Sequence, residues 1–338
     1  MKIKQSKRIA TTAIVIIIAV SLILFSVFYL SSQNPYPGKV ESITIGLLPN
    51  ELNSLIYIAN DQQYFAAEGL NVTIKDYSSI LTAVNEMLTG DVDISTASEF
   101  VFAGNALANK AVRTITTIDK VDQVSIIGRK DRGIDGISDL AGKRIGVFKG
   151  SVAEFYLGRF LELNGMRLSQ VTLVDTSSNV VDALTNGTVD AVATGQPNIN
   201  RIENAFGNET TALPAQSGQS SYYSALCTDS WAAAHPELIT RFLTALVQAE
   251  RYVINNPNEA KAVIQSRLNY STSYMTEVWS DHEFSLSLDQ SLILAMEDES
   301  RWLISNNLAN ATSVPNFLNY VYADGLESVK PNSVNIIK

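Results

Sequence analysis

An internal duplication restricts the possible folds of this chain more than any other feature. Three short segments recur in the same order, at separations of 100, 99 and 97 residues. One such match would be unremarkable because strand-like runs resemble one another, but three in register indicate two similar lobes. The recurring pairs are Ile43–Leu48 with Lys143–Phe148, Val72–Ser79 with Val171–Ser178, and Val84–Asp93 with Val181–Asp190.

Within each half, short apolar and β-branched runs alternate with longer segments of helical periodicity. This alternation predicts an α/β fold in which helices cover both faces of mostly parallel sheets. The strands are expected at 43–48, 72–77 and 92–97 in the first half and at 144–148, 171–176 and 189–194 in the second. The helices that follow them are expected at 53–67, 80–89, 98–109, 151–164, 179–186 and 197–206.

Two further strand-like runs, Val124–Arg129 and Tyr222–Cys227, each end one copy of the repeat. We interpret them as crossover strands between the lobes, and hence as a hinge. Residues 41–127 together with 223–338 are therefore assigned to lobe one, and residues 128–222 to lobe two. The end of the chain predicts helices that complete lobe one, at 236–255, 258–267 and 288–307.

The N-terminal segment indicates the compartment. Residues 10–30 are uncharged and long enough to span a bilayer, so they are predicted to form a transmembrane anchor. All nearby basic residues precede this anchor, which places residues 1–9 in the cytoplasm and the rest outside. Residues 31–40 would then be a linker, and the protein a single-pass protein of the cell membrane with an extracytoplasmic soluble domain. A cleaved signal peptide is the alternative, but Phe28–Leu30 stand where its cleavage site needs small residues.

Charge and cysteine content exclude several functions. The net charge is −9. The first 31 residues contain four basic residues and no acidic one, so the rest of the chain carries −13. Such an acidic protein repels nucleic acid. The single cysteine, Cys227, allows no intrachain disulfide and no cysteine-based metal site, and it is expected to be a buried small side chain. His235 is interpreted as a helix-entry residue and His282 as a surface residue, so we expect no metal, no cofactor and no catalytic group.

The candidate ligand site follows from the duplication, because ligands of open parallel sheets bind beyond the carboxyl ends of the strands. Three pairs of loops are expected there, and their residues are mostly small hydroxyl and amide side chains suited to hydrogen bonding. Tyr222, on the second crossover strand, is added as a stacking residue. The candidate ligand-binding residues are Asn50, Ser78, Ser79, Ser98, Glu99, Gly150, Ser151, Thr176, Asn179, Gln196 and Tyr222.

Two of these candidates lead to a hypothesis about ligand charge. Ser151 opens a predicted helix, whose N-terminus attracts anions, although Ser151 and Glu154 also form a capping box with a purely structural use. Glu99 would instead attract an amine or another donor, unless it is only a first-turn helix charge. We therefore expect a small zwitterion or a polar heterocycle gripped at opposite ends by Ser151 and Glu99.

Several longer stretches carry a family resemblance. Ile56–Val72, Leu88–Ile94, Asp139–Ser151 and Ala183–Ala191 together resemble the nitrate/sulfonate/taurine-type substrate-binding proteins of ABC importers, whose relatives bind thiamine-precursor pyrimidines. The resemblance implies a two-lobed periplasmic-binding-type fold (type II), a ligand held between the lobes, and permease and ATPase subunits as partners. It also implies that Ser151 holds an anionic ligand group. Many members carry an aromatic–acid–Pro turn where this chain has Gly195–Pro197, so their ligands do not transfer directly.

These observations favour the solute-binding subunit of an ABC importer, which captures a sulfonate, a zwitterion or a pyrimidine-like ligand by hinge closure. A ligand-sensing ectodomain is an alternative, because one transmembrane segment also suits a receptor. An enzyme on the same fold is a weaker alternative. Pyrimidine-synthesising relatives use a cysteine-rich segment and a histidine, whereas this chain has one cysteine and no histidine in the predicted cleft loops.

Overall fold

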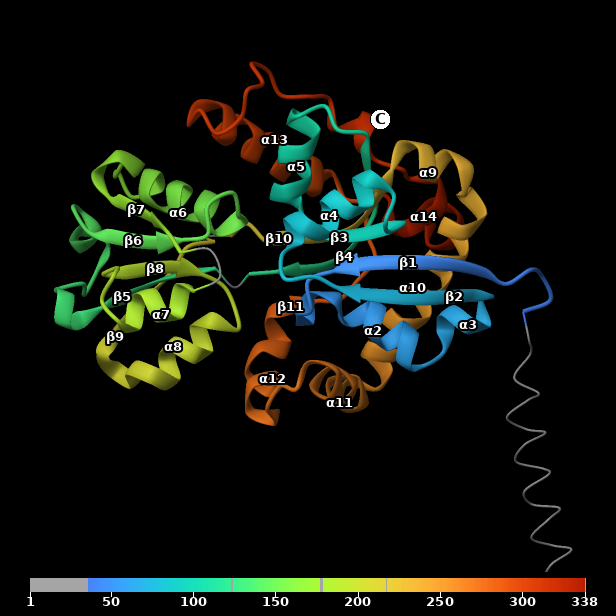
Figure 1. The fold of residues 1–338 in the computed structure, drawn as a ribbon, viewed down its shortest axis with the longest axis horizontal. Coiled ribbons are helices and arrows are strands. Elements are labelled where there is room, and N and C mark those ends of the chain that lie inside the picture. Colours follow the sequence, from blue (N-terminus) through green and yellow to red (C-terminus); the bar gives the residue numbers. More distant parts are fainter. Residues whose placement is uncertain (1–35, 123, 177–178, 217, 338) are drawn as a thin grey trace, which may run out of the picture.

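The computed structural model describes residues 36–122, 124–176, 179–216 and 218–337. They form two α/β lobes, each built around one β-sheet (Figure 1). The predicted transmembrane anchor, residues 10–30, lies outside the described residues. Among the helices of the described part, none has the length and apolar character that a membrane span needs.

Lobe one contains a six-stranded sheet in the order β11-β4-β10-β3-β1-β2, and lobe two a five-stranded sheet in the order β7-β6-β8-β5-β9. The strands of lobe one are β1 (Glu41–Leu47), β2 (Leu70–Asp76), β3 (Ile94–Ser98), β4 (Val112–Val121), β10 (Ser221–Thr228) and β11 (His282–Glu283). The strands of lobe two are β5 (Ser125–Arg129), β6 (Arg144–Val147), β7 (Thr172–Asp175), β8 (Ala191–Thr194) and β9 (Thr210–Pro214).

Both sheets repeat one topology. In each lobe the first strand of the repeat pairs in parallel with the second on one side and with the third on the other, as in β1 with β2 and β3 and in β6 with β7 and β8. In each sheet the third strand of the repeat also pairs with an antiparallel strand that follows a passage of the chain from the other lobe. This strand is β10, beside β3, in lobe one and β5, beside β8, in lobe two. The two-lobed α/β architecture predicted from the duplication is confirmed.

Helices cover both faces of the sheets, as the alternating sequence pattern predicted. Lobe one carries α2 (Ser54–Asp61), α3 (Tyr64–Ala67), α4 (Ile80–Thr89) and α5 (Glu99–Leu107), and lobe two carries α6 (Val152–Leu163), α7 (Val180–Thr185) and α8 (Asn198–Phe206). The C-terminal region adds α9 (Asp229–Ala234), α10 (Pro236–Asn255), α11 (Pro257–Leu268), α12 (Thr272–Val278), α13 (Gln290–Ser305) and α14 (Asp324–Val329). The single helix expected at 53–67 is divided, because Gln63 takes a left-handed conformation (φ 61°) between α2 and α3.

The cores explain why these segments are strands and helices. Every residue of β3 is buried, because α-helices cover it on both faces. In lobe one the ring of Phe65 on α3 stacks on Phe242 of α10, with centroids 5.6 Å apart. In lobe two Ile145 on β6 is completely buried in the same core as Leu157 and Leu161 of α6. Full burial of an aliphatic side chain of this size contributes about 1.5–3 kcal/mol.

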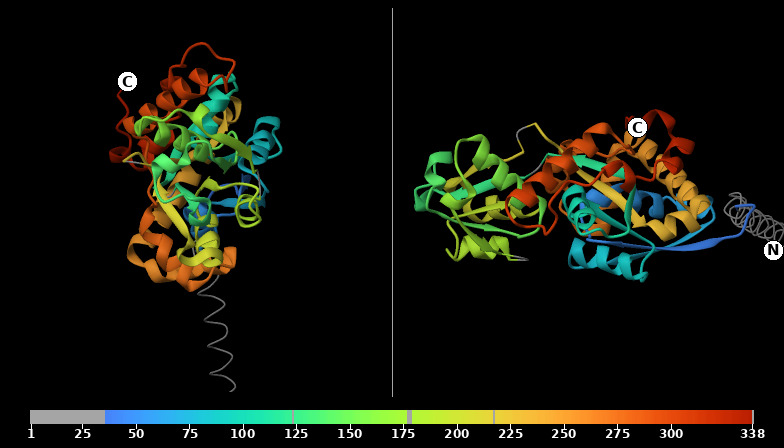
Figure 2. Two further views of the ribbon diagram at one scale, coloured as in Figure 1. Left: turned by 90° about the vertical axis from the view of Figure 1, so that its left-hand side faces the viewer. Right: turned by 90° about the horizontal axis from the view of Figure 1, so that it is seen from above.

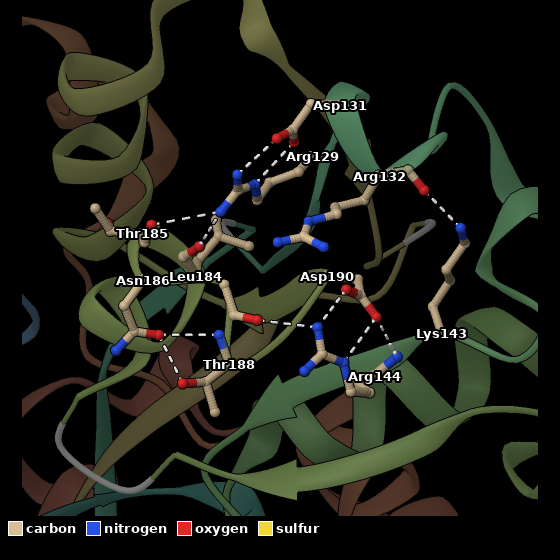
Figure 3. Close-up of polar contacts among 11 residues, drawn as sticks. Arg129, Asp131, Arg132, Lys143, Arg144, Leu184, Thr185, Asn186, Thr188 and Asp190 are labelled. Atoms are coloured by element: carbon tan, nitrogen blue, oxygen red, sulfur yellow. Dashed lines mark hydrogen bonds and ion pairs between the residues drawn. The ribbon is translucent and has the colours of Figure 1, made fainter.

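The repeated aspartates hold equivalent strands in place. Asp93 accepts a hydrogen bond of 2.7 Å from the backbone N–H of Thr44 in the middle of β1. Asp190 accepts the corresponding bond, 3.0 Å, from the N–H of Arg144 at the start of β6, and also binds the guanidinium group of Arg144 (Figure 3). Each aspartate immediately precedes a parallel strand, β3 or β8, at the end opposite the edge where ligands are expected, so this part of the duplication is structural.

The chain passes between the sheets twice. The first crossing connects the end of β4, at Val121, to the start of β5, at Ser125. The second connects the end of β9, at Pro214, to the start of β10, at Ser221. The lobe boundaries expected at 127/128 and 222/223 lie slightly beyond these crossings, since residues 125–127 pair within lobe two's sheet and Tyr222 within lobe one's.

Helix α13 also departs from the expected division. We assigned it to lobe one, but it lies over the junction between the lobes, beside α5 (Figures 1 and 2). Its residues Trp302 and Leu303 belong to the core of lobe two. The reason is aromatic packing, because the Trp302 ring meets Phe155 of α6 edge-on, with centroids 5.6 Å apart.

Candidate ligand-binding cleft

A cleft of about 850 Å³ lies between the lobes, at the carboxyl ends of the parallel strands. Both lobes and both crossings contribute to its lining. At the first crossing these lining residues are Val121 and Val124. At the second crossing they are Gln216 and Ser221. A ligand in this cleft would therefore contact both lobes together with the two segments that join them.

Seven of the eleven predicted site residues line the cleft: Ser78, Ser79, Ser98, Gly150, Ser151, Gln196 and Tyr222. They come from all three predicted pairs of loops and from the start of β10. Some of their hydroxyl groups are already used within the protein. Ser79 and Ser98 cap α4 and α5 by accepting hydrogen bonds from the backbone N–H groups of Thr82 and Val101.

Three predicted residues stand near the cleft but outside its lining. The side-chain oxygen of Asn50 accepts a hydrogen bond of 2.9 Å from Asn53. Thr176 is buried, with 8% exposure, and its methyl group packs on Gly146 of β6. Asn179 is exposed at the start of α7. Their loops border the cleft, but the Asn50 side chain is directed to Asn53, the Thr176 side chain to the interior and the Asn179 side chain to solvent.

Glu99 requires a larger correction. Its side chain is completely buried and does not line the cleft. Burial raises the pKa of its carboxyl group to about 8, so at neutral pH the group is mainly uncharged. Glu99 is the first residue of α5, and the helix turns its side chain away from the cleft toward Glu299 of α13. The hypothesis that Glu99 grips a ligand amine is therefore abandoned.

The N-terminus of α6 presents backbone donors to the cleft. The side chain of Glu154 accepts a hydrogen bond of 2.7 Å from the N–H of Gly150, and the hydroxyl of Ser151 donates to the carbonyl of Phe148 at 2.6 Å. The capping box expected between Ser151 and Glu154 does not form, because Glu154 binds the N–H of Gly150 instead of the N–H of Ser151. Ser151, Val152 and Ala153 all line the cleft at this positive end of the helix.

Arg201, on α8, was missed by the sequence reasoning. Among the described lining residues it carries the single positive charge, and no described carboxylate lies within ion-pair distance of it. The predicted loop ends at Pro197, whereas the first turn of α8 brings Arg201 back to the cleft. Its helical spacing from Pro197 is the signal that could have found it.

The walls of the cleft are largely apolar. Leu48, Leu52, Val101 and Val180 contribute aliphatic surface, and Tyr222 and Tyr223 contribute aromatic surface. Two large apolar side chains of the lining are partly exposed, Leu81 on α4 at 41% and Phe148 before α6 at 38%. Because one belongs to each lobe, they offer apolar contacts from both sides. Such a cleft, apolar with a few directed polar groups, is typical of small-molecule sites.

The lobes also touch beside the cleft. Asn200 on α8 donates a hydrogen bond of 3.0 Å to Glu277 on α12, which connects lobe two to lobe one. Near this contact the buried carboxylate of Glu51 accepts hydrogen bonds from Tyr274 at 2.7 Å and Tyr270 at 3.0 Å. The positive charge of Arg201 acts to lower the pKa of both tyrosines, so α8 lies near this group.

Groups with potential for nucleophilic or acid–base chemistry lie elsewhere. Cys227 is buried in β10, as predicted, and burial raises the pKa of its thiol to about 12. His282 was expected on the surface, but its side chain is 1% exposed and its Nδ1 lies 2.6 Å from Asp119. His235 borders a separate cavity of about 300 Å³ with Trp231. Within the described residues no three His, Cys, Asp or Glu side chains are grouped as metal ligands.

Comparison with known proteins confirms the resemblance identified from the sequence. Residues 52–260 match the family described as NMT1/THI5 like. The chain is 25% identical over 220 residues to the 4-amino-5-hydroxymethyl-2-methylpyrimidine phosphate synthase of Aspergillus parasiticus, covering 61% of this chain and 64% of that protein, which is less than two thirds of its length. It is 19% identical over 289 residues to the formylaminopyrimidine-binding protein of Halalkalibacterium halodurans, covering 80% and 85%.

A solved structure supports the same fold. The alkanesulfonate-binding protein SsuA from Xanthomonas axonopodis pv. citri, bound to MOPS, superposes with a TM-score of 0.73 at 17% sequence identity. The superposition covers 85% of this chain and 99% of that protein. At this level of identity the likeness establishes the two-lobed binding-protein fold.

Proposed function

Because the chain belongs to the NMT1/THI5-like family, we propose that it is the extracytoplasmic solute-binding subunit of an ABC importer. The observation that carries this proposal is the cleft of about 850 Å³, whose lining is drawn from both lobes and both crossings. A ligand there would contribute contacts to both lobes only when they are closed, and would therefore favour the closed state.

The proposed ligand is an organic anion with an apolar body. Arg201 and the N-terminus of α6 supply positive potential, while the aliphatic and aromatic walls would bury the remainder of the ligand. With Glu99 outside the lining, no described carboxylate faces the cleft, and the zwitterion expected from the sequence loses its partner for an amine. The sulfonate name of one structural neighbour and the pyrimidine name of one relative are compatible with a small polar head on an apolar or planar body.

Binding without conversion is the second part of the proposal. The polar residues of the described lining are serine, threonine, asparagine, glutamine, arginine and tyrosine side chains, and no described histidine is hydrogen-bonded to any of these serines. The thiol and the two histidines lie outside the lining. The synthase name of one relative raises the enzymatic alternative, which needs a reactive group at the ligand.

Location and partners belong to the same proposal. An anchor formed by residues 10–30 would hold the binding lobes outside the membrane, where a permease with its ATPase subunit would receive the ligand. A receptor role is the alternative for such an anchored lobe pair. Genes for a permease and an ATPase beside this one would favour the importer.

Thermal unfolding of the purified protein with a panel of ligands tests binding. The panel would contain alkane- and arylsulfonates, aromatic carboxylates, amines and pyrimidines. We expect organic anions to raise the melting temperature and to be recovered unchanged after incubation. Steady conversion of a ligand to a product, or stabilisation by amines and by no anion, would contradict the proposal.

Two matched substitutions locate the binding site. Ala153→Trp fills the cleft at the N-terminus of α6, whereas Ala234→Trp fills the separate cavity beside Trp231. The first variant should lose the ligand-induced rise in melting temperature, and the second should keep it. A rise that survives in Ala153→Trp would place the ligand outside the cleft.

A further inference from the structure

Two buried glutamates meet where the lobes join. Glu99 is the first residue of α5, and Glu299 lies in the middle of α13. Both side chains are completely buried, and each carboxyl group affects the pKa of the other. None of their four carboxyl oxygens has a hydrogen-bond partner among the described residues. Two ionised carboxylates in this position would repel each other without water or a cation to compensate them.

The groups around Glu99 do not supply a positive charge. The hydroxyl of Ser221 and the backbone N–H of Tyr222 lie beside it and lower its pKa, without reaching hydrogen-bond geometry. The ring hydroxyls of Tyr222 on β10 and Tyr156 on α6 are the other titratable groups that face it. The effect of burial is therefore the largest, and it raises the pKa of Glu99 to about 8.

The groups around Glu299 are similar. Arg159 of α6 is close enough to lower its pKa, but this arginine forms an ion pair with Asp298, the neighbour of Glu299. Burial, followed by the effect of Glu99, raises the pKa of Glu299 well above its usual range. In neither case does a described cation lie within ion-pair distance of the carboxyl group.

The pair stands directly beside an apolar seam between the lobes. Phe100, next to Glu99, and Trp302, one helical turn beyond Glu299, both pack on Phe155 of lobe two, with ring centroids 6.0 and 5.6 Å away. Ser221 begins β10, immediately after the second crossing. A charge on either glutamate would thus lie next to the aromatic contacts that hold α6 of lobe two against α5 and α13.

We propose that Glu99 and Glu299 form a proton-controlled latch between the lobes. When both carboxyl groups are protonated, the seam formed by Phe100, Phe155 and Trp302 is closed. Loss of a proton to solvent at alkaline pH creates a buried charge, which is relieved when the seam opens and water enters. The consequence for the cleft rests on the proposed function: opening the seam would lower ligand affinity. The latch itself needs no ligand.

Fluorescence of Trp302 tests the latch in the ligand-free protein. In a Trp231→Phe/Trp279→Phe background, Trp302 is the remaining one of the chain's three tryptophans. Between pH 6 and 9.5 we expect its emission to shift to the red with a midpoint near pH 8, while far-ultraviolet circular dichroism stays constant. The radius of gyration from X-ray scattering should rise over the same range.

Near-isosteric substitutions show whether the two glutamates cause the pH-dependent shift of the Trp302 emission. Glu99→Gln and Glu299→Gln should each remove it or displace it by more than one pH unit, because a neutral amide cannot ionise. Glu297→Gln, at a partly exposed position on the same helix paired with Arg301, should behave as the parent does. Circular dichroism of each variant verifies folding, and if one glutamine variant does not fold, the other decides.

The latch would be overturned by any of three results. The emission of the parent could stay constant from pH 6 to 9.5. The transition could persist unchanged in both glutamine variants. Its midpoint could follow the concentration of sodium or calcium ions at fixed pH, which would indicate a cation site. Because no ligand is present, these results are independent of ligand binding: a latch can fail while the cleft still binds anions, and the reverse.

Discussion

The side-chain oxygen of Gln216 accepts a hydrogen bond of 2.6 Å from the backbone N–H of Val124, so one crossing between the lobes is tied to the other. The amide group of the same side chain donates to the carbonyl of Val121 at 3.2 Å. Both ends of the first crossing are therefore attached to a single residue of the second. Gln216 is 2% exposed, so water does not compete for these bonds.

Replacing Gln216 with alanine should weaken this connection. The buried N–H of Val124 would lose its partner, at a cost of about 1–3 kcal/mol in the free energy of unfolding. Denaturant unfolding measures the loss, and amide hydrogen exchange at Val124 and Ser125 should become faster. Gln170→Ala, at an exposed position, is the control and should have a smaller effect. Equal effects of the two substitutions would show that the crossings do not depend on Gln216.

The ion pair between Asp190 and Arg144 predicts a pH-dependent contribution to stability. Hydrogen bonds from Arg144 lower the pKa of Asp190. The stabilisation is therefore complete above the ordinary pKa of an aspartate and is lost as the pH falls through the lowered value. Asp190→Asn should reduce the free energy of unfolding by about 1–2 kcal/mol at pH 7 and by less at pH 3. Asp182→Asn, at an exposed position on α7, serves as the control. If the loss of unfolding free energy in Asp190→Asn were larger at pH 3 than at pH 7, the predicted pH dependence would be wrong.

The buried pair of His282 and Asp119 predicts a different pH dependence. Burial alone would lower the pKa of His282, but the Asp119 carboxylate raises it above its ordinary value. The stabilisation from the imidazolium requires an ionised Asp119, and it is lost as the pH rises through the raised pKa of His282. Burial raises the pKa of Asp119 to about 6, so the two groups form an ion pair near pH 7.

His282→Ala should therefore destabilise the protein by about 3–5 kcal/mol at pH 7, because it leaves a buried carboxylate unpaired. At pH 5 the loss should be smaller, since Asp119 can take up a proton. Adding Asp119→Asn to His282→Ala should restore part of the stability at pH 7. Denaturant unfolding at both pH values measures these differences. A loss that is the same at pH 5 and pH 7 would mean that packing, and not charge, is responsible.

The sequence contained enough periodic signal to predict the architecture but not the direction of individual side chains. The duplicated strands appeared where expected, and α10 has the predicted bounds, Pro236–Asn255. Glu99 follows the cleft residue Ser98, but one residue along a helix is a rotation of about 100°, and this turns Glu99 into the interior. The burial of His282 depends on Asp119, 163 residues away, and local patterns carry no information about such a partner.

Calorimetric titration of benzenesulfonate and its uncharged analogue benzenesulfonamide into the wild-type protein and Arg201→Gln examines the proposed recognition of organic anions. A hydrogen bond to a charged group contributes about 1.5–3 kcal/mol, so Arg201→Gln should bind the sulfonate at least about tenfold more weakly. Binding of the sulfonamide should change little, and Arg167→Gln, exposed outside the cleft lining, should match the wild type for both compounds. Equal affinity of wild type and Arg201→Gln for the sulfonate would show that Arg201 does not recognise the anion, and would contradict the proposed ligand class.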